Sequence, residues 1–247
     1  MFCSTLPQGA PDLMRVSEFR RYLDDLDRLH GTDAANSRLT SLSPSLMQDL
    51  QRFEQHGQQS ELLEVLAAGV RHTQPLAVHL QFGQQVLTLT VFPVHKLAHC
   101  ALPMDKVLDS DLGKLQVLQV EQATLRAPGD RETALIGDPA LYAPLAPVLW
   151  AMAMRGSREA LLPEIAGQAA YRVAPGVSFD GLALPVVLQR CITRLRRQTS
   201  NLREICEWPG IDRPRAQRML NAIYLQAGLI VSRTHPAATN EGWAGYR

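Results

Sequence analysis

The sequence has few of the features that identify an enzyme or a metal protein by inspection. It contains no GxSxG, no GxxxxGK phosphate loop, no GxGxxG nucleotide loop and no HExxH pair. Its four cysteines, Cys3, Cys100, Cys191 and Cys206, include no CxxC pair, which argues against a disulfide framework and a zinc ribbon. An unfamiliar enzyme stays possible because catalytic residues need not be near in sequence. The absences favour binding and regulation, and they give no reason to expect a cofactor.

Long apolar runs are also absent. The apolar stretch at residues 145–154 is far shorter than the roughly 20 residues that a membrane-spanning helix needs. No basic segment near the N-terminus leads into an apolar run. We therefore expect a cytoplasmic protein with no membrane contact. At 247 residues, the chain is long enough for one larger and one smaller domain.

Lysine is scarce, since three lysines accompany 22 arginines, and the charge is unevenly placed. From Pro185 to the C-terminus ten arginines stand against four acidic residues, a net charge of +6, so residues 1–184 carry −5 of the overall +1. This asymmetry indicates a C-terminal part that faces a polyanion. A solvated arginine-rich surface that also pairs with the acidic part would give the same count, and this alternative stays open.

Periodicity in the first half predicts helices followed by a small sheet. Apolar residues at helical spacing predict an amphipathic helix over residues 12–29. Ser43-Pro44 begins a helix that continues to about Gln55, and Ser60 caps another. The sheet is predicted from a period-two hairpin of residues 76–82 and 86–92 around Gly83, and from a third strand over residues 114–125.

The second half begins with an almost wholly apolar segment. Residues 141–155 predict a helix buried between layers, entered near Pro144 or Pro147 and ended by Gly156. A short helix through Leu161-Leu162 and a strand at 169–173 are predicted to follow. Together with the first half, this order of elements predicts an α+β fold with a mostly antiparallel sheet.

The last quarter has the clearest local signals. Residues 186–198 predict a helix with one packed side, and Asn201 with Glu204 resembles a capping box for a short second helix. Asp212 is a good N-cap for a third helix over residues 213–226. Gly228 ends that helix, and residues 229–233 predict a strand.

This order of elements is that of a winged helix-turn-helix. The stretch LREICEWPGIDRPRAQRMLNAIYLQAGLI resembles that superfamily in its hydrophobic spacing and in its closing AGLI. We therefore expect two domains, an α/β or α+β regulatory or interaction domain at 1–178 and a winged-helix-like domain at 179–247. The ending LNAIYLQAGLIVSRTHP also resembles the regulatory domain that follows some class I methyltransferases. No glycine-rich loop for S-adenosylmethionine is present, so this second resemblance implies a regulatory module without catalysis.

The winged-helix resemblance implies a specific set of DNA contacts. If the third helix enters the major groove, side chains at four-residue spacing would reach base edges, because Arg suits guanine and Gln or Asn suits adenine. Arginines on the first helix and the strand would then contact phosphates. The predicted base-reading set is Arg213, Gln217 and Asn221, with Arg215 and Arg218 beside them, and the predicted phosphate contacts are Arg194, Arg197 and Arg233.

A protein-binding role is the alternative. Many winged helices bind proteins, and the return strand of a wing is not evident after Arg233. The protein is thus predicted to be either a DNA-binding regulator or a protein–protein adaptor, and both hypotheses stay open.

His79, His95, His99 and Cys100 are the only cluster of metal-capable side chains. A hairpin would bring His79 near His95, since paired residues approach within about 5 Å. Metal sites usually need three or four converging ligands, and the HxxxHC spacing matches no familiar zinc pattern. We therefore expect no metal site.

Overall fold

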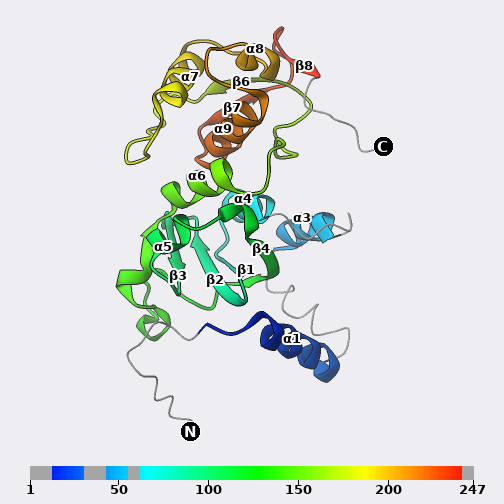
Figure 1. The fold of residues 1–247 in the computed structure, drawn as a ribbon, viewed down its shortest axis with the longest axis vertical. Coiled ribbons are helices and arrows are strands. Elements are labelled where there is room, and N and C mark those ends of the chain that lie inside the picture. Colours follow the sequence, from blue (N-terminus) through cyan, green and yellow to red (C-terminus); the bar gives the residue numbers. More distant parts are fainter. Residues whose placement is uncertain (1–12, 31–42, 55–61, 241–247) are drawn as a thin grey trace.

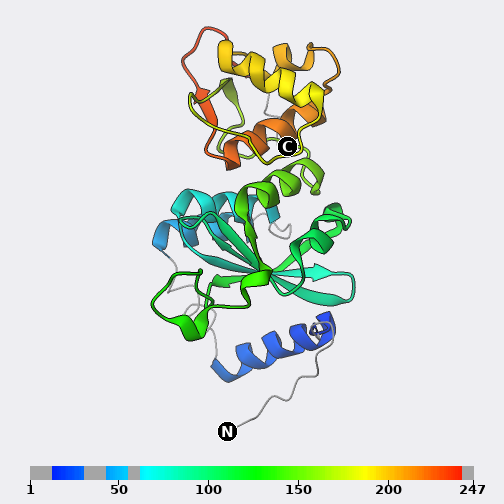
Figure 2. The same ribbon diagram turned by 90° about the vertical axis from the view of Figure 1, so that its left-hand side faces the viewer.

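The computed structural model describes residues 13–30, 43–54 and 62–240. It contains a five-stranded and a three-stranded sheet, in both of which the paired strands are antiparallel, together with several helices. Figures 1 and 2 show the two sheets at different heights along the long axis of the molecule, with α6 and α9 between them. The α+β class predicted from the sequence is confirmed.

The larger sheet is a meander with one strand added on each side, in the order β4-β1-β2-β3-β5. Its central hairpin is the predicted one, and Gly83 adopts a φ of 62° in the turn, a conformation that glycine tolerates best. The third predicted strand is also present and is shorter than expected. The five strands are β1 (Leu76–Phe82), β2 (Gln85–Phe92), β3 (Leu97–Cys100), β4 (Gln116–Gln122) and β5 (Tyr142–Pro144).

Helices cover both faces of this sheet. Figures 1 and 2 place α4 (Leu62–His72) and α6 (Leu145–Arg155) on one face and α1 (Val16–His30) on the other. The face toward α4 and α6 carries fully buried residues such as Val78 and Leu87. Two further helices are α3 (Pro44–Glu54) and α5 (Met104–Leu108), and the 3-10 turns are η1 (Leu112–Lys114), η2 (Thr133–Leu135) and η3 (Pro139–Leu141).

The helices predicted at 12–29 and from Ser43-Pro44 are confirmed as α1 and α3. The predicted ends Asp12 and Gln55 and the predicted cap Ser60 lie outside the described residues.

Helix α6 follows the sequence prediction closely. It begins after Pro144, and Gly156 is its C-cap. A short helix at Leu161-Leu162 was also predicted, and this prediction is wrong, because the segment is a non-helical connection. Both leucines are nevertheless buried, at 3% and 0% exposure. They pack into the core from an irregular backbone, so their apolar pairing reflects burial and not helix formation.

The C-terminal helices lie where the sequence places them. They are α7 (Val186–Arg197), α8 (Leu202–Cys206) and α9 (Arg213–Leu225). The capping box is present, since the Asn201 side chain accepts from the Glu204 backbone N–H and the Glu204 carboxylate accepts from the Asn201 backbone N–H. The Asp212 carboxylate accepts from the Arg215 backbone N–H at 2.9 Å, which confirms it as the N-cap of α9.

The smaller sheet has the order β7-β6-β8, with β6 (Gln168–Val173) in the centre, β7 (Leu229–Ser232) on one side and β8 (Thr239–Asn240) on the other. A strand after β7 is therefore present, although it has only two residues and pairs with β6 instead of β7. The described residues thus contain no β7–β8 hairpin. Strand β6 precedes residue 178, the predicted end of the first domain, and belongs to the sheet of the C-terminal helices.

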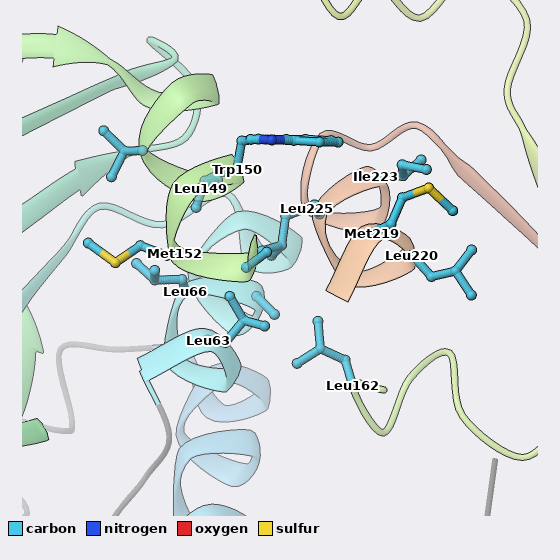
Figure 3. Packing of buried hydrophobic residues seen from close by; sticks show 14 of the residues in the cluster. Leu63, Leu66, Leu149, Trp150, Met152, Leu162, Met219, Leu220, Ile223 and Leu225 are labelled. Carbon is cyan, nitrogen blue, oxygen red and sulfur yellow. The ribbon is translucent and has the colours of Figure 1, made fainter. Parts of the chain in front are cut away.

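Helices α6 and α9 join the two parts of the chain. Figure 3 shows α4, α6 and α9 contributing to one apolar cluster, with Leu162 entering from the connecting segment. Met219, Leu220 and Ile223 of α9 are each 0% exposed. Figure 3 shows these three side chains on the side of α9 away from α6 and Leu225 on the side toward α6, so both sides of α9 belong to the buried cluster that joins the two parts of the chain.

Candidate nucleic-acid interface

Asn221, one of the predicted base-reading residues, is fully buried in the structure. Its Oδ1 accepts a hydrogen bond from the Leu162 backbone N–H at 2.9 Å, and its Nδ2 donates to the Ala160 carbonyl oxygen at 2.9 Å. Both halves of the amide are thus used inside the protein. In this arrangement Asn221 fixes the connecting segment against α9 and does not face a ligand.

Two of the predicted arginines donate hydrogen bonds to backbone carbonyl groups of the protein itself. Arg218 donates to the carbonyl oxygen of Met154, at the end of α6, at 2.8 Å, and its side chain lies 3.4 Å from the Glu159 carboxylate. Arg233 donates to three carbonyl oxygens, those of residues 164, 166 and 168. These guanidinium groups tie β7 and α9 to neighbouring segments, so most of their donor capacity is used within the fold.

The other predicted residues of α9 lie in its first two turns. Arg213 is exposed, and Arg215 and Gln217 are partly exposed. The accessible part of the predicted base-reading set is therefore Arg213, Arg215 and Gln217.

Helix α7 presents a row of arginines. Arg190, Arg194 and Arg197 are exposed and follow each other at spacings of four and three, which places them on one face. The Arg194 guanidinium lies 4.5 Å from the centre of the Trp208 ring, a cation–π arrangement that holds its side chain in place. Arg194 and Arg197 were predicted from the sequence. Arg190 was not among the predicted contacts, although its helical spacing to Arg194 is readable in the sequence.

The arginine row of α7 and the start of α9 lie on neighbouring parts of the surface. Burial raises the pKa of the Cys191 thiol of α7, and the positive charges of Arg215 and Arg194 oppose this rise, so both guanidinium groups lie within electrostatic range of one thiol. The Val187 side chain also lies against Gly210, in the turn before α9. We call the resulting surface the basic face; its residues are Arg190, Arg194, Arg197 and Arg215.

The charge on the basic face is largely uncompensated. Arg190, Arg194, Arg197 and Arg215 form no ion pair with any carboxylate of the described ranges. Exposed guanidinium groups of this kind bind phosphate through paired N–H donors. The surface is thus chemically suited to a polyanion.

The histidines noted in the sequence have separate roles. His79 lies between two partners, with its Nε2 3.0 Å from the Glu121 carboxylate and its Nδ1 3.0 Å from the Thr88 hydroxyl. His99 is buried against the Tyr142 ring; burial lowers the pKa of its imidazole more than the charge of Asp138 raises it. His95 is exposed. Among the described residues no three metal-capable side chains converge.

A polar network links α3 and α4 to the segment before β6. The Ser45 hydroxyl lies 3.3 Å from His72 Nδ1, and His72 Nε2 lies 2.7 Å from the Asp49 carboxylate, an order that resembles a serine hydrolase triad. Arg71, however, donates to the same Asp49 carboxylate at 2.5 Å and to Glu164 at 2.6 Å.

The pKa values in this network fit a structural role. Burial raises the pKa of Asp49, whereas the His72 hydrogen bond and the positive charge of Arg71 together lower it by a larger amount, so the net pKa lies below the ordinary value. The Asp49 carboxylate is shared between His72 and Arg71, so it does not serve the imidazole alone as the acid of a hydrolase triad does. The exposed Ser45 therefore belongs to an ion-pair network that braces α3 and α4 against Glu164.

Comparisons with protein-family models, with curated proteins and with solved structures give no match to this chain. None of the described helices combines the length and the hydropathy that crossing a bilayer requires.

Proposed function

We propose that the protein is a non-catalytic regulator that binds double-stranded DNA through the basic face. The observation that carries the proposal is the convergence of three arginines of α7 with Arg215 of α9 on one surface, where none of the four has a carboxylate partner in the described ranges. Helix-turn-helix proteins use the N-terminal residues of their recognition helix to contact base edges. The accessible end of α9 is that end.

The burial of each side chain determines which residues can reach the bases of DNA. Arg213 and Gln217 are the accessible α9 side chains that suit guanine and adenine edges, whereas Asn221 is internal. The α7 arginines would meet phosphates, which supply affinity and carry little sequence information. We therefore expect strong dependence on salt and modest discrimination among DNA sequences.

The expected salt dependence can be stated as a number. Four arginines that each neutralise one phosphate give a slope of about −3.6 in a plot of log affinity against log salt concentration. Affinity should then fall about 150-fold when monovalent salt rises from about 50 mM to about 200 mM. Each arginine removed should make the slope shallower by about 0.9.

The experiment is a fluorescence-anisotropy titration of a labelled duplex with the full chain at several salt concentrations. The test variant carries Arg→Gln at 190, 194, 197 and 215, and binding at low salt should be lost or reduced by at least 100-fold. The matched control carries Arg→Gln at 15, 20, 21 and 131, four exposed arginines outside the basic face, and should keep most of the affinity. No binding by the native chain at low salt, or equal loss in both variants, would refute the proposal.

A second candidate is the protein–protein adaptor. It is favoured by the absence of a β7–β8 hairpin among the described residues and by the packing of α9 against α6, in which a recognition helix already serves a protein contact. An adaptor would use the basic face for an acidic protein segment. Binding of a polyglutamate peptide by the native chain, lost in the basic-face variant and accompanied by no DNA binding at low salt, would favour this alternative.

A further inference from the structure

A cavity of about 770 Å³ lies where the two parts of the chain meet. Its wall is formed by the end of α5, one side of α6, the connection before α7 and the starts of α7 and α9. The volume falls within the range of about 300–1,000 Å³ that small-molecule sites occupy, and junctions between domains are a common place for such sites.

The wall of the cavity is mainly apolar. Trp150 and Met154 contribute from α6, Leu182 from the connection and Leu188 from α7. Figure 3 shows the Trp150 ring between α6 and α9. A flat aromatic or aliphatic group entering the cavity would replace water against these side chains, a gain of about 25 cal/mol for each Å² of apolar surface covered.

The polar groups of the cavity favour an anion. Arg155 is exposed and Arg215 is partly exposed, and neither forms an ion pair with a carboxylate in the described parts of the chain. The wall holds three carboxylates: Glu159 lies beside Arg218, Asp212 caps α9, and Asp109 is exposed and forms no ion pair within the described ranges. The Nε of Arg218, a further wall residue, is buried and has no hydrogen-bond partner among the described residues. Two unpaired guanidinium groups and the Arg218 Nε therefore stand against one unpaired carboxylate, that of Asp109, so the unused donors exceed the unused acceptors.

We propose that this cavity binds an amphipathic organic anion, with an apolar body against Trp150 and Met154 and a carboxylate or sulfonate between Arg155 and Arg215. The site needs no nucleic acid and is independent of the proposed function in that respect. It also contains Arg215, which belongs to the basic face. A bound anion would neutralise Arg215 and so weaken DNA binding, and this regulatory step rests on the proposed DNA-binding function.

The expected coupling between anion binding and DNA binding equals the loss of one phosphate contact, that of Arg215. Loss of one arginine–phosphate contact reduces affinity by about 8-fold at about 0.1 M salt. By linkage, saturating DNA should weaken binding of the anion by the same factor.

Anilinonaphthalene sulfonate is the probe, because it combines an aromatic body with one sulfonate and fluoresces when bound. Native full-length protein should bind it at one site, and Ala151→Trp, which fills the cavity from α6, should weaken binding at least 10-fold. The double variant Arg155→Gln/Arg215→Gln should weaken binding of the sulfonate about 5- to 10-fold and leave binding of neutral phenylnaphthylamine unchanged. Arg190→Gln, on the basic face but outside the cavity, is the matched control and should bind both probes as the native chain does.

The outcomes separate the two proposals. Unchanged probe binding in Ala151→Trp would overturn the site, and equal effects of the arginine changes on the charged and neutral probes would overturn its preference for anions. If Ala151→Trp does not fold with the native circular dichroism spectrum, Ala151→Leu replaces it under the same criteria. Anion binding without DNA binding would refute the proposed function and leave the cavity site standing. DNA binding that saturating probe does not weaken would overturn the coupling.

Discussion

Replacement of Asn221 by alanine tests whether this residue is an internal clamp. The native amide satisfies the backbone N–H of Leu162 and the carbonyl of Ala160. Leu162 and Asn221 are both 0% exposed, so water cannot readily replace the first bond. Ala160 is exposed, so water can replace the second.

The expected magnitude follows from these two environments. An unsatisfied buried N–H costs about 1–3 kcal/mol, and the net loss of a hydrogen bond that water can replace is about 1 kcal/mol. Asn221→Ala should therefore reduce the free energy of unfolding by about 3 kcal/mol. Since a chain of this size loses about 2–4 °C per kcal/mol, the midpoint of thermal unfolding should fall by about 6–12 °C.

The assay is urea denaturation followed by tryptophan fluorescence and circular dichroism. Gln217→Ala is the control, because Gln217 lies one turn earlier on α9, is partly exposed and forms no hydrogen bond within the described ranges; it should change stability by less than about 0.5 kcal/mol. A loss below about 1 kcal/mol in Asn221→Ala, or equal losses in both variants, would refute the clamp. A folded Asn221→Ala protein should also keep its DNA affinity, because the amide does not reach the surface.

Three further perturbations test other parts of the fold. Arg158→Met should lower the free energy of unfolding by about 3–5 kcal/mol, because it removes the 2.7 Å ion pair of the Glu64 carboxylate, which is only 14% exposed. Adding Glu64→Gln to this variant should recover part of the loss in urea denaturation. No recovery would argue against the pair. Asp49 has a lowered pKa, so its charged form stabilises the fold above about pH 4 and loses that effect as the pH falls through the lower folded value. The stability difference between native protein and Asp49→Asn should accordingly be larger at about pH 6 than at about pH 3, and a pH-independent difference would contradict this. Burial raises the pKa of Cys100 to about 11, and only thiolates react readily. Peptide mapping after alkylation at about pH 8 should therefore find the partly exposed Cys206 modified well before Cys100. The reverse order of modification would contradict the burial of Cys100.

Local signals predicted most of the elements. The hairpin turn at Gly83, the capping box at Asn201 and the N-cap at Asp212 each depend on residues within a few positions of one another, so the sequence is sufficient to predict them. Strand β3 was not predicted, because Leu97–Cys100 is only four residues long and its stability comes from pairing with β2 and β5. Strand β8 is shorter still, and two residues cannot show a period of two.

Long-range packing determined which predicted site residues are accessible. Helical spacing placed Arg213, Gln217 and Asn221 on one face of α9, and that is correct as geometry. The sequence did not show that α6 and the connection at residues 157–162 would cover the second half of that face. The side chains of Arg218 and Asn221 form hydrogen bonds with backbone carbonyl and N–H groups about 60 residues earlier in the chain. No local sequence pattern indicates such contacts.

The position of β6 has a consequence for how the chain is made and cut. Its partners β7 and β8 are translated after it, and the pairing of Gln168 with Asn240 spans nearly a third of the chain. During synthesis the bridge between Tyr171 and Ser200 is the one backbone pairing in the described residues that β6 can form before α8 and α9 emerge. The rest of its edges stay exposed until then, and exposed strand edges are sites of aggregation. A fragment that begins at Pro185 would lack the central strand permanently. Expression of the C-terminal helices alone should therefore succeed only when the fragment begins before Gln168.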